Sequence, residues 1–167
     1  DIVIRRTNAR FFTLKKGKIM KKYLIALVSL MACTTTFAQD NLQAQKLQIV
    51  KRIYAGGGNH QTLINNSTRD FKSVFIEDER NTPIGEVGCI DYDLITQGQD
   101  SNPKEISRSL KTSITDNGHV LATFRNFGKL NKLTYVMSCN GNRCLVDDVL
   151  ENGKSFKRSI RKCIRSL

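Results

Sequence analysis

Four cysteines are the residues of this chain with the clearest capacity for chemistry. Their even number favours disulfide bonds if they lie outside the cytoplasm. Cys139 and Cys144 flank a short turn and would face each other across a hairpin, where opposed Cα atoms lie about 4.5 Å apart, within reach of a disulfide. Cys89 would then pair with Cys163 by exclusion. We expect no metal site, because neither histidine lies near these cysteines and none of them has the two-residue spacing of a zinc ligand pair.

A second candidate site depends on the register of the same hairpin. If Cys139 faces Cys144, Tyr135 faces Asp148 on a strand face that is otherwise apolar. A carboxylate in such a place must be hydrogen-bonded. Tyr135 and Asp148, with Arg125 from the neighbouring strand, are therefore candidates for the polar groups of a ligand cavity. The competing interpretations are that the phenol simply satisfies the acid, or that a one-residue shift turns Asp148 to solvent and Asp147 inward.

Three carboxylates in the segment 91–100 form a third group. Their spacing is not that of a calcium loop, and no bidentate glutamate closes the segment. Asp91 and Asp93 remain candidate ligand-binding residues. No Ser, His and acid set and no nucleotide loop is recognisable, so the sequence predicts neither catalytic residues nor a cofactor. The triple glycine at 56–58 follows a helix and lacks the Lys and Ser/Thr of a phosphate loop.

Helices are expected before the segment 91–100. Asp40 can cap a helix over 40–54 that ends at the three glycines. Ser67 or Thr68 begins a second helix, and the acidic run 77–79 is expected as its solvated end.

Strands are expected after Pro103, where the apolar period is interpreted as two. Asn117 and Gly118 predict a hairpin turn, with Ile114 facing Leu121. The next strand, 120–127, has apolar residues on both faces and is expected to be covered on both sides. Two further strands, 132–139 and 144–150, follow. The expected fold class is α+β.

The last segment, 155–167, has an amphipathic helical pattern with a basic side. This pattern fits a docked helix with a solvated basic face. The alternative is a surface for anionic lipid or for an acidic partner.

The N-terminal part predicts export. Lys21 and Lys22 precede an apolar run of eleven residues, and Thr36 and Ala38 suit cleavage before Gln39. Residues 20–38 are thus expected to be a signal peptide, residues 1–19 an upstream extension that is not native, and residues 39–167 one domain. The alternative is a lipoprotein anchored at Cys33. The expected location is periplasmic or secreted.

The charge of the chain is unevenly distributed. The chain has 167 residues, a net charge of +12 and 40% hydrophobic residues, which fits one globular domain. Residues 39–153 hold thirteen Lys or Arg and fourteen Asp or Glu, whereas the last fourteen residues hold six cations and no acid. Because the body has no basic excess, the sequence does not predict a nucleic-acid-binding protein.

Two short motifs resemble a known family. The Asp, Leu, Gln and Asp pattern of 91–100 and the strand end 145–149 resemble exported bacterial domains of unknown function in the nuclear transport factor 2-like (cystatin-like) superfamily, although that family usually has Trp where this chain has Leu145. The resemblance covers roughly residues 42–165. It implies N-terminal helices packed on a curved, cone-like antiparallel sheet of about four strands, with a pocket that serves catalysis in some members and binding in many.

These observations favour an exported, non-catalytic binding domain for a small molecule or an envelope protein. One alternative is a periplasmic inhibitor or immunity protein against a cell-wall-active enzyme or toxin. Another is an isomerase- or lyase-like enzyme that uses Asp148 and Tyr135. Membrane contact is expected only through a lipid at Cys33 or through the basic C-terminal helix, and a homodimer is compatible with the sequence.

Overall fold

The computed structural model describes residues 39–167, which form one compact unit. The expected signal peptide, the upstream extension and the candidate lipid site at Cys33 lie outside the described residues. Within residues 39–167, no helix has the length and apolar character needed to cross a membrane.

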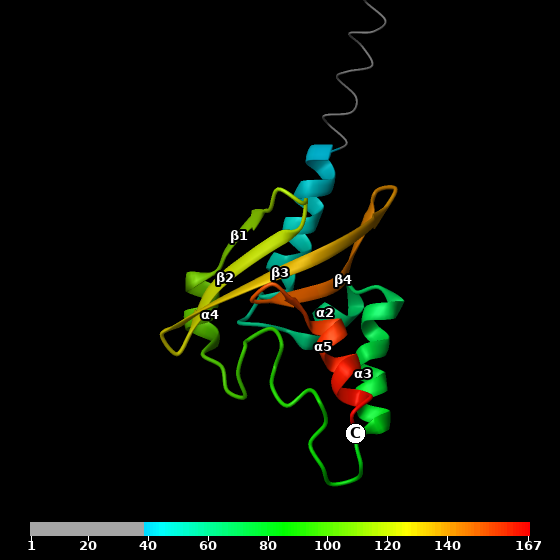
Figure 1. The fold of residues 1–167 in the computed structure, drawn as a ribbon. Helices are drawn as coiled ribbons and strands as arrows, with labels where there is room; N and C mark the ends of the chain where they lie inside the picture. Colours follow the sequence, from blue (N-terminus) through cyan, green and yellow to red (C-terminus); the bar gives the residue numbers. More distant parts are fainter. Residues whose placement is uncertain (1–38) are drawn as a thin grey trace, which may run out of the picture. The chain divides into compact units, whose positions relative to one another are not determined.

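The domain has the predicted α+β class. An antiparallel sheet of five strands, rather than about four, runs in the order β1-β2-β3-β4-β5, and helices precede, flank and follow it (Figure 1). The strands are β1 (Lys111–Ile114), β2 (Val120–Asn126), β3 (Lys129–Asn140), β4 (Arg143–Glu151) and β5 (Lys154–Ser155). Each strand pairs with the next along the chain, so the sheet needs only short connections.

The first helix spans 39–53 and contributes Ile49, Val50 and Ile53 to the core. Its glycine-rich exit has a packing reason, because a Cβ atom on Gly57 would lie 2.3 Å from Cβ of Pro103. Two short segments thus meet closely after the helix ends. Helix α2 (His60–Asn65) follows and was not predicted.

Helix α3 (Arg69–Asn81) begins as expected, with the Thr68 hydroxyl accepting from the backbone N–H of Phe71 at 3.2 Å. Its acidic end differs from the prediction. Asp78 is buried, and its carboxylate accepts from the backbone N–H groups of Cys89 at 2.8 Å and Ile90 at 3.1 Å. The expectation of a fully solvated acidic run was therefore wrong at Asp78, which shapes the following loop.

The segment after Pro103 is a helix, α4 (Pro103–Ser109), and not the expected strand. Asn102 caps it by accepting from the N–H of Glu105 at 3.2 Å, and proline suits the first turn. Ile106 and Leu110 are four residues apart, which is a helical spacing as well as an even one. The sequence pattern alone therefore could not decide between the two.

The β1–β2 register is one residue from the prediction, since Ile114 pairs with Val120 and not Leu121. The backbone N–H of Thr115 donates to the carbonyl of His119 at 2.9 Å, so three residues rather than two form the turn. Gly118 takes the left-handed conformation that such a turn needs, with φ +71°.

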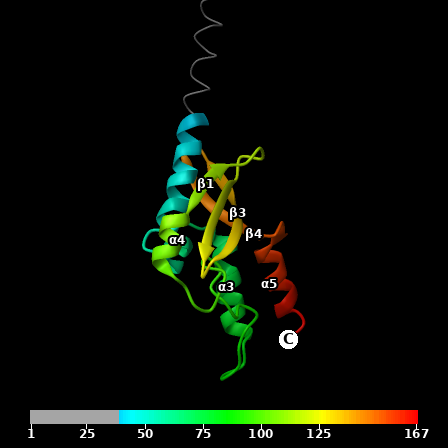
Figure 2. The same ribbon diagram turned by 90° about the vertical axis from the view of Figure 1, so that its left-hand side faces the viewer.

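Strand β2 is covered on one face only. Val120, Ala122 and Phe124 are fully buried, whereas Leu121 is half-buried and Arg125 is exposed on the other face. The prediction that both faces are covered was wrong. Figures 1 and 2 show the first helix against one side of the sheet.

The β3–β4 register agrees with the prediction near the turn, where Cys139 faces Cys144. An irregularity between Val136 and Met137 then shifts the ladder, so that Tyr135 faces Val149 and Val136 faces Asp148. The expected Tyr135–Asp148 pair was therefore wrong, because one extra residue on β4 changes every later partner.

Helix α5 (Phe156–Ile164) has the predicted amphipathic character, with Phe156 and Ile160 buried. It lies beside α3 in both ribbon views (Figures 1 and 2). Both predicted cysteine pairs are at disulfide distance. The Sγ–Sγ distance is 2.06 Å for Cys139–Cys144 and for Cys89–Cys163, and the second pair connects the loop after α3 to α5.

Candidate functional site

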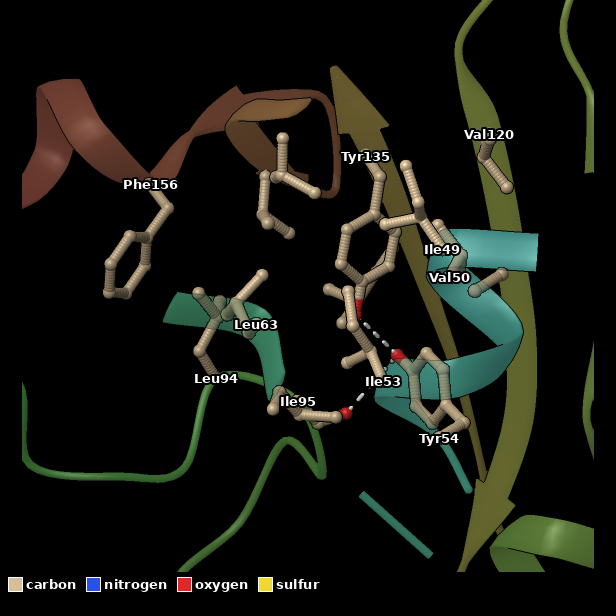
Figure 3. Close-up of a cluster of buried hydrophobic side chains, with 14 of the residues drawn as sticks. Ile49, Val50, Ile53, Tyr54, Leu63, Leu94, Ile95, Val120, Tyr135 and Phe156 are labelled. Carbon is tan, nitrogen blue, oxygen red and sulfur yellow. Dashed lines mark hydrogen bonds between the residues drawn. The ribbon is translucent and has the colours of Figure 1, made fainter. Parts of the chain in front are cut away.

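The inner face of the sheet, where the resemblance implied a pocket, is filled with side chains (Figure 3). Tyr135 is fully buried, and its hydroxyl donates to the Tyr54 hydroxyl at 2.9 Å. The Tyr54 hydroxyl in turn donates to the carbonyl of Ile95 at 3.3 Å. Burial raises the pKa of both phenols. The chain of hydrogen bonds satisfies Tyr135 inside the core, where its predicted role as a ligand contact has no space.

Asp148 is a helix cap. Its carboxylate accepts from the backbone N–H groups of Val149 at 2.8 Å and Lys157 at 3.0 Å, and from the Ser155 hydroxyl. Ser155 itself accepts from the N–H of Arg158 at 3.0 Å. The two residues together satisfy two first-turn N–H groups of α5, those of Lys157 and Arg158, which would otherwise lack partners.

The segment 91–100 is ordered by a different carboxylate. Asp93 accepts from the backbone N–H groups of Ile95 at 2.7 Å and Thr96 at 3.0 Å, which is an Asx turn. Asp91 is exposed. Asp93 therefore has a structural role in this loop.

Sequence reasoning missed the partner of this segment, which is Glu151 at the end of β4. The Tyr92 hydroxyl donates to the Glu151 carboxylate at 2.6 and 2.7 Å, and the Gln97 amide donates to it at 2.5 Å. Burial first, and then the hydrogen bond to Glu151, raise the pKa of Tyr92. Nothing in the local sequence around Glu151 indicates a partner more than fifty residues earlier.

Arg125 lies apart from these groups. It is exposed on the outer face of β2, and its guanidinium donates to the carbonyl of Gly128 at 2.6 Å. The structure therefore does not bring Tyr135, Asp148, Arg125, Asp91 and Asp93 into one cavity. Four surface hollows of the described domain are lined by neither Tyr135 nor Asp148.

The described residues contain no group of three or more His, Cys, Asp and Glu side chains placed to hold a metal ion. His119 accepts through Nδ1 from the backbone N–H of Met137 at 3.4 Å, and the His60 ring packs edge-on against Phe75. All buried side-chain nitrogen and oxygen atoms of the described residues have a hydrogen-bond partner. Residues 39–167 therefore hold no buried side-chain nitrogen or oxygen atom that lacks a partner and could mark a ligand site.

The C-terminal cations divide into two sets. Lys157 forms ion pairs with Asp70 at 2.6 Å and Asp147 at 3.1 Å, and Arg161 pairs with Asp70 at 2.8 Å and with Glu77 at 3.0 Å. Hydrogen bonds from Arg161, and then from Lys157, lower the pKa of Asp70, and Arg161 likewise lowers that of Glu77. This first set fastens α5 to α3 and β4.

The second set has no acidic partner within residues 39–167. We call it the basic stripe, and it consists of Lys154, Arg158, Lys162 and Arg165. All four side chains are exposed. They line an open hollow of about 440 Å³ together with Gly153, Ser155 and Ser159. The stripe runs from β5 along α5 to its C-cap, and these unpaired like charges are the candidate functional site.

No protein-family model, curated protein or solved structure matches this chain. The resemblance to the nuclear transport factor 2-like superfamily thus stays an expectation from short motifs.

Proposed function

We propose that residues 39–167 form an exported, non-catalytic binding domain that recognises a polyanionic component of the cell envelope through the basic stripe. The observation that carries the proposal is the division of the α5 cations. Lys157 and Arg161 pair with acids of α3 and β4. The other two helix cations, Arg158 and Lys162, have no acidic partner within residues 39–167, and they line one hollow with the C-cap residue Arg165 and with Lys154 of β5. Docking of α5 therefore accounts for Lys157 and Arg161 but not for the four cations of the basic stripe.

The composition of the hollow favours a polyanion over an apolar ligand. Its lining has cations, glycine and two serines but no apolar side chain. Arg158 and Arg165 can each bind a carboxylate or phosphate group with two parallel hydrogen bonds. Arg158 on α5 and Arg165 at its C-cap are seven residues apart, which corresponds to about 10 Å along a helix. A polymer with repeated anionic groups can contact both at once.

Two further observations support an exported domain. The cysteine pairs Cys89–Cys163 and Cys139–Cys144 are at disulfide distance, which is compatible with an oxidising compartment. The signal-like segment 20–38 gives a route to that compartment. The filled inner face of the sheet supports binding on the surface instead of in a cone-like pocket.

The proposal is tested with inorganic polyphosphate as a defined polyanion. The double substitution Arg158→Gln and Lys162→Gln should weaken binding about fivefold, because it removes two of the four unpaired charges. The binding of the wild-type protein should also weaken as salt is added. Isothermal titration calorimetry measures both effects.

The matched control removes the same charge elsewhere. Lys51 and Arg52 are exposed on the first helix, and Lys51→Gln with Arg52→Gln should leave the affinity within twofold of wild type. Equal losses in the two double variants would mean that net charge alone governs binding. That result would contradict a site at the basic stripe.

A further inference from the structure

The β2–β3 turn presents an aromatic side chain in a conformation that suits it poorly. Phe127 and Gly128 form this two-residue turn with φ +49° and +77°. Asn-Gly is the favoured pair for such a turn, because a large L side chain in the left-handed region is strained. Phe127 gains little burial in return, since the residue is 64% exposed.

Neighbouring segments hold this turn firmly. The Glu105 carboxylate accepts from the backbone N–H of Gly128 at 3.0 and 3.2 Å, and Arg125 donates to the carbonyl of the same glycine at 2.6 Å. Asn126 accepts from the N–H of Asn102 at 2.9 Å. A strained residue persists where surrounding contacts determine its conformation. These contacts fix the backbone of the turn that carries the exposed Phe127.

The surroundings of Phe127 combine apolar and basic side chains. We call residues 125–132 the hairpin tip. Leu130 is 51% exposed, and Arg125, Lys129 and Lys132 are exposed around it. Arg108 and Lys111 join Arg125, Leu130 and Lys132 around a hollow of about 430 Å³.

The acids near the hairpin tip are few. Glu105 is bound to the turn, and Asp100 lines a second hollow beside Phe127 and Lys129. Figure 1 shows the turn between β2 and β3 projecting beyond α4 at the edge of the domain. Its apolar side chains can therefore reach a flat surface before the rest of the sheet does.

We propose that the hairpin tip binds a bilayer containing anionic phospholipid, with Phe127 and Leu130 entering the headgroup region and the surrounding cations contacting lipid phosphates. An exposed aromatic and an aliphatic side chain ringed by Lys and Arg suit the membrane interface, where apolar burial and electrostatic attraction add. The basic stripe has no apolar side chain in its hollow. The two surfaces therefore fit different ligands, and this proposal does not rest on the first.

The absence of tryptophan from the chain makes a local test available. A Phe127→Trp variant, purified from the periplasm of a bacterial host, carries its single indole at the hairpin tip. Its emission should shift to shorter wavelength with vesicles of phosphatidylcholine and phosphatidylglycerol, and much less with phosphatidylcholine alone. Contact between the vesicle and another part of the chain would not shift the emission of this indole. An unshifted spectrum at saturating lipid would overturn the proposal.

A second variant separates binding from folding. Phe127→Asn gives the turn its favoured residue, so the thermal midpoint should stay the same or rise. Vesicle affinity should nevertheless fall about tenfold, because an interfacial aromatic side chain is lost. Co-sedimentation with the mixed vesicles measures this affinity. Wild-type affinity in Phe127→Asn would show that Phe127 does not enter the bilayer and would refute the inference.

The charges are tested with a matched pair. Lys129→Gln with Lys132→Gln, two exposed residues whose side chains do not hold the turn, should reduce binding to the mixed vesicles at least fivefold, because cations near an anionic surface contribute to binding. The first-helix control, Lys51→Gln with Arg52→Gln, removes the same charge and should have less than half of that effect on the free energy of binding. An equal effect would show general attraction of the protein and would also count against the hairpin tip.

Discussion

Single buried polar residues of this domain serve mainly to pair backbone groups. The Asp78 carboxylate accepts from two backbone N–H groups of the loop after α3, and Asp148 accepts from those of Val149 and Lys157. An unpaired buried N–H is costly, so each carboxylate fixes a change of chain direction. The buried carboxylates of Asp78 and Asp148 therefore have structural roles in this protein.

Removing the Asp148 carboxylate should accordingly lower stability. Asp148→Ala is expected to reduce the free energy of unfolding by about 3 kcal/mol, because the buried Val149 N–H, the buried Ser155 hydroxyl and the partly buried Lys157 N–H lose their acceptor. Asp148→Asn should cost only about 1 kcal/mol, since the amide oxygen still accepts while the charge at the helix N-terminus is lost. Urea unfolding measures both values. The exposed Asp116→Asn is the control, and an unchanged midpoint in Asp148→Ala would contradict the capping role.

At the scale of elements, two cysteine pairs close loops of very different length. Cys89 and Cys163 are 74 residues apart in sequence, and their pair joins the loop after α3 to α5. Cys139 and Cys144 are five residues apart and close one hairpin. Because a cross-link restricts the unfolded chain more when it closes a longer loop, the first pair should contribute more to stability.

The two pairs can be removed separately. Replacing Cys89 and Cys163 with serine should lower the free energy of unfolding by about 4 kcal/mol, against about 2 kcal/mol for the same change at Cys139 and Cys144. Urea unfolding under non-reducing conditions compares the two variants. A larger loss from the hairpin pair would contradict the loop-length argument for this domain.

At the scale of the whole molecule, the sequence predicted correctly those features of the fold that depend on local residue patterns. Alternating apolar residues identified β3 and β4, and the cysteines set their pairing beside the turn. Further from the turn, the β3–β4 register depends on one extra residue in β4. The alternation of apolar residues does not reveal this extra residue. Helix α4 was mistaken for a strand, because residues four apart share a face in a helix and in a strand alike.

The candidate site was only partly visible in the sequence. The basic side of 155–167 was recognised in the sequence. Which of its cations are paired depends on the acids of α3, which lie about ninety residues earlier and contact Arg161 only in the folded chain. The exposed turn at Phe127 was taken as the end of a strand. Sequence spacing cannot show that the backbone of a turn is fixed by residues of another element.

The ion pairs between α3 and α5 predict how the stability of the whole domain changes at low pH. The folded-state pKa values of Asp70 and Glu77 lie below their ordinary values of 3.8 and 4.5. Their contribution is therefore complete above these ordinary values and is lost as the pH falls through the lower folded-state values. Both carboxylates are partly exposed, so each pair should contribute less than about 1 kcal/mol.

Urea unfolding of Arg161→Gln should show a shallower loss of stability between pH 5 and pH 3, a range that brackets the ordinary pKa values of 3.8 and 4.5. Arg158→Gln, which removes an equal but unpaired charge, should keep the wild-type slope, and identical slopes in all three proteins would exclude these pairs as the source.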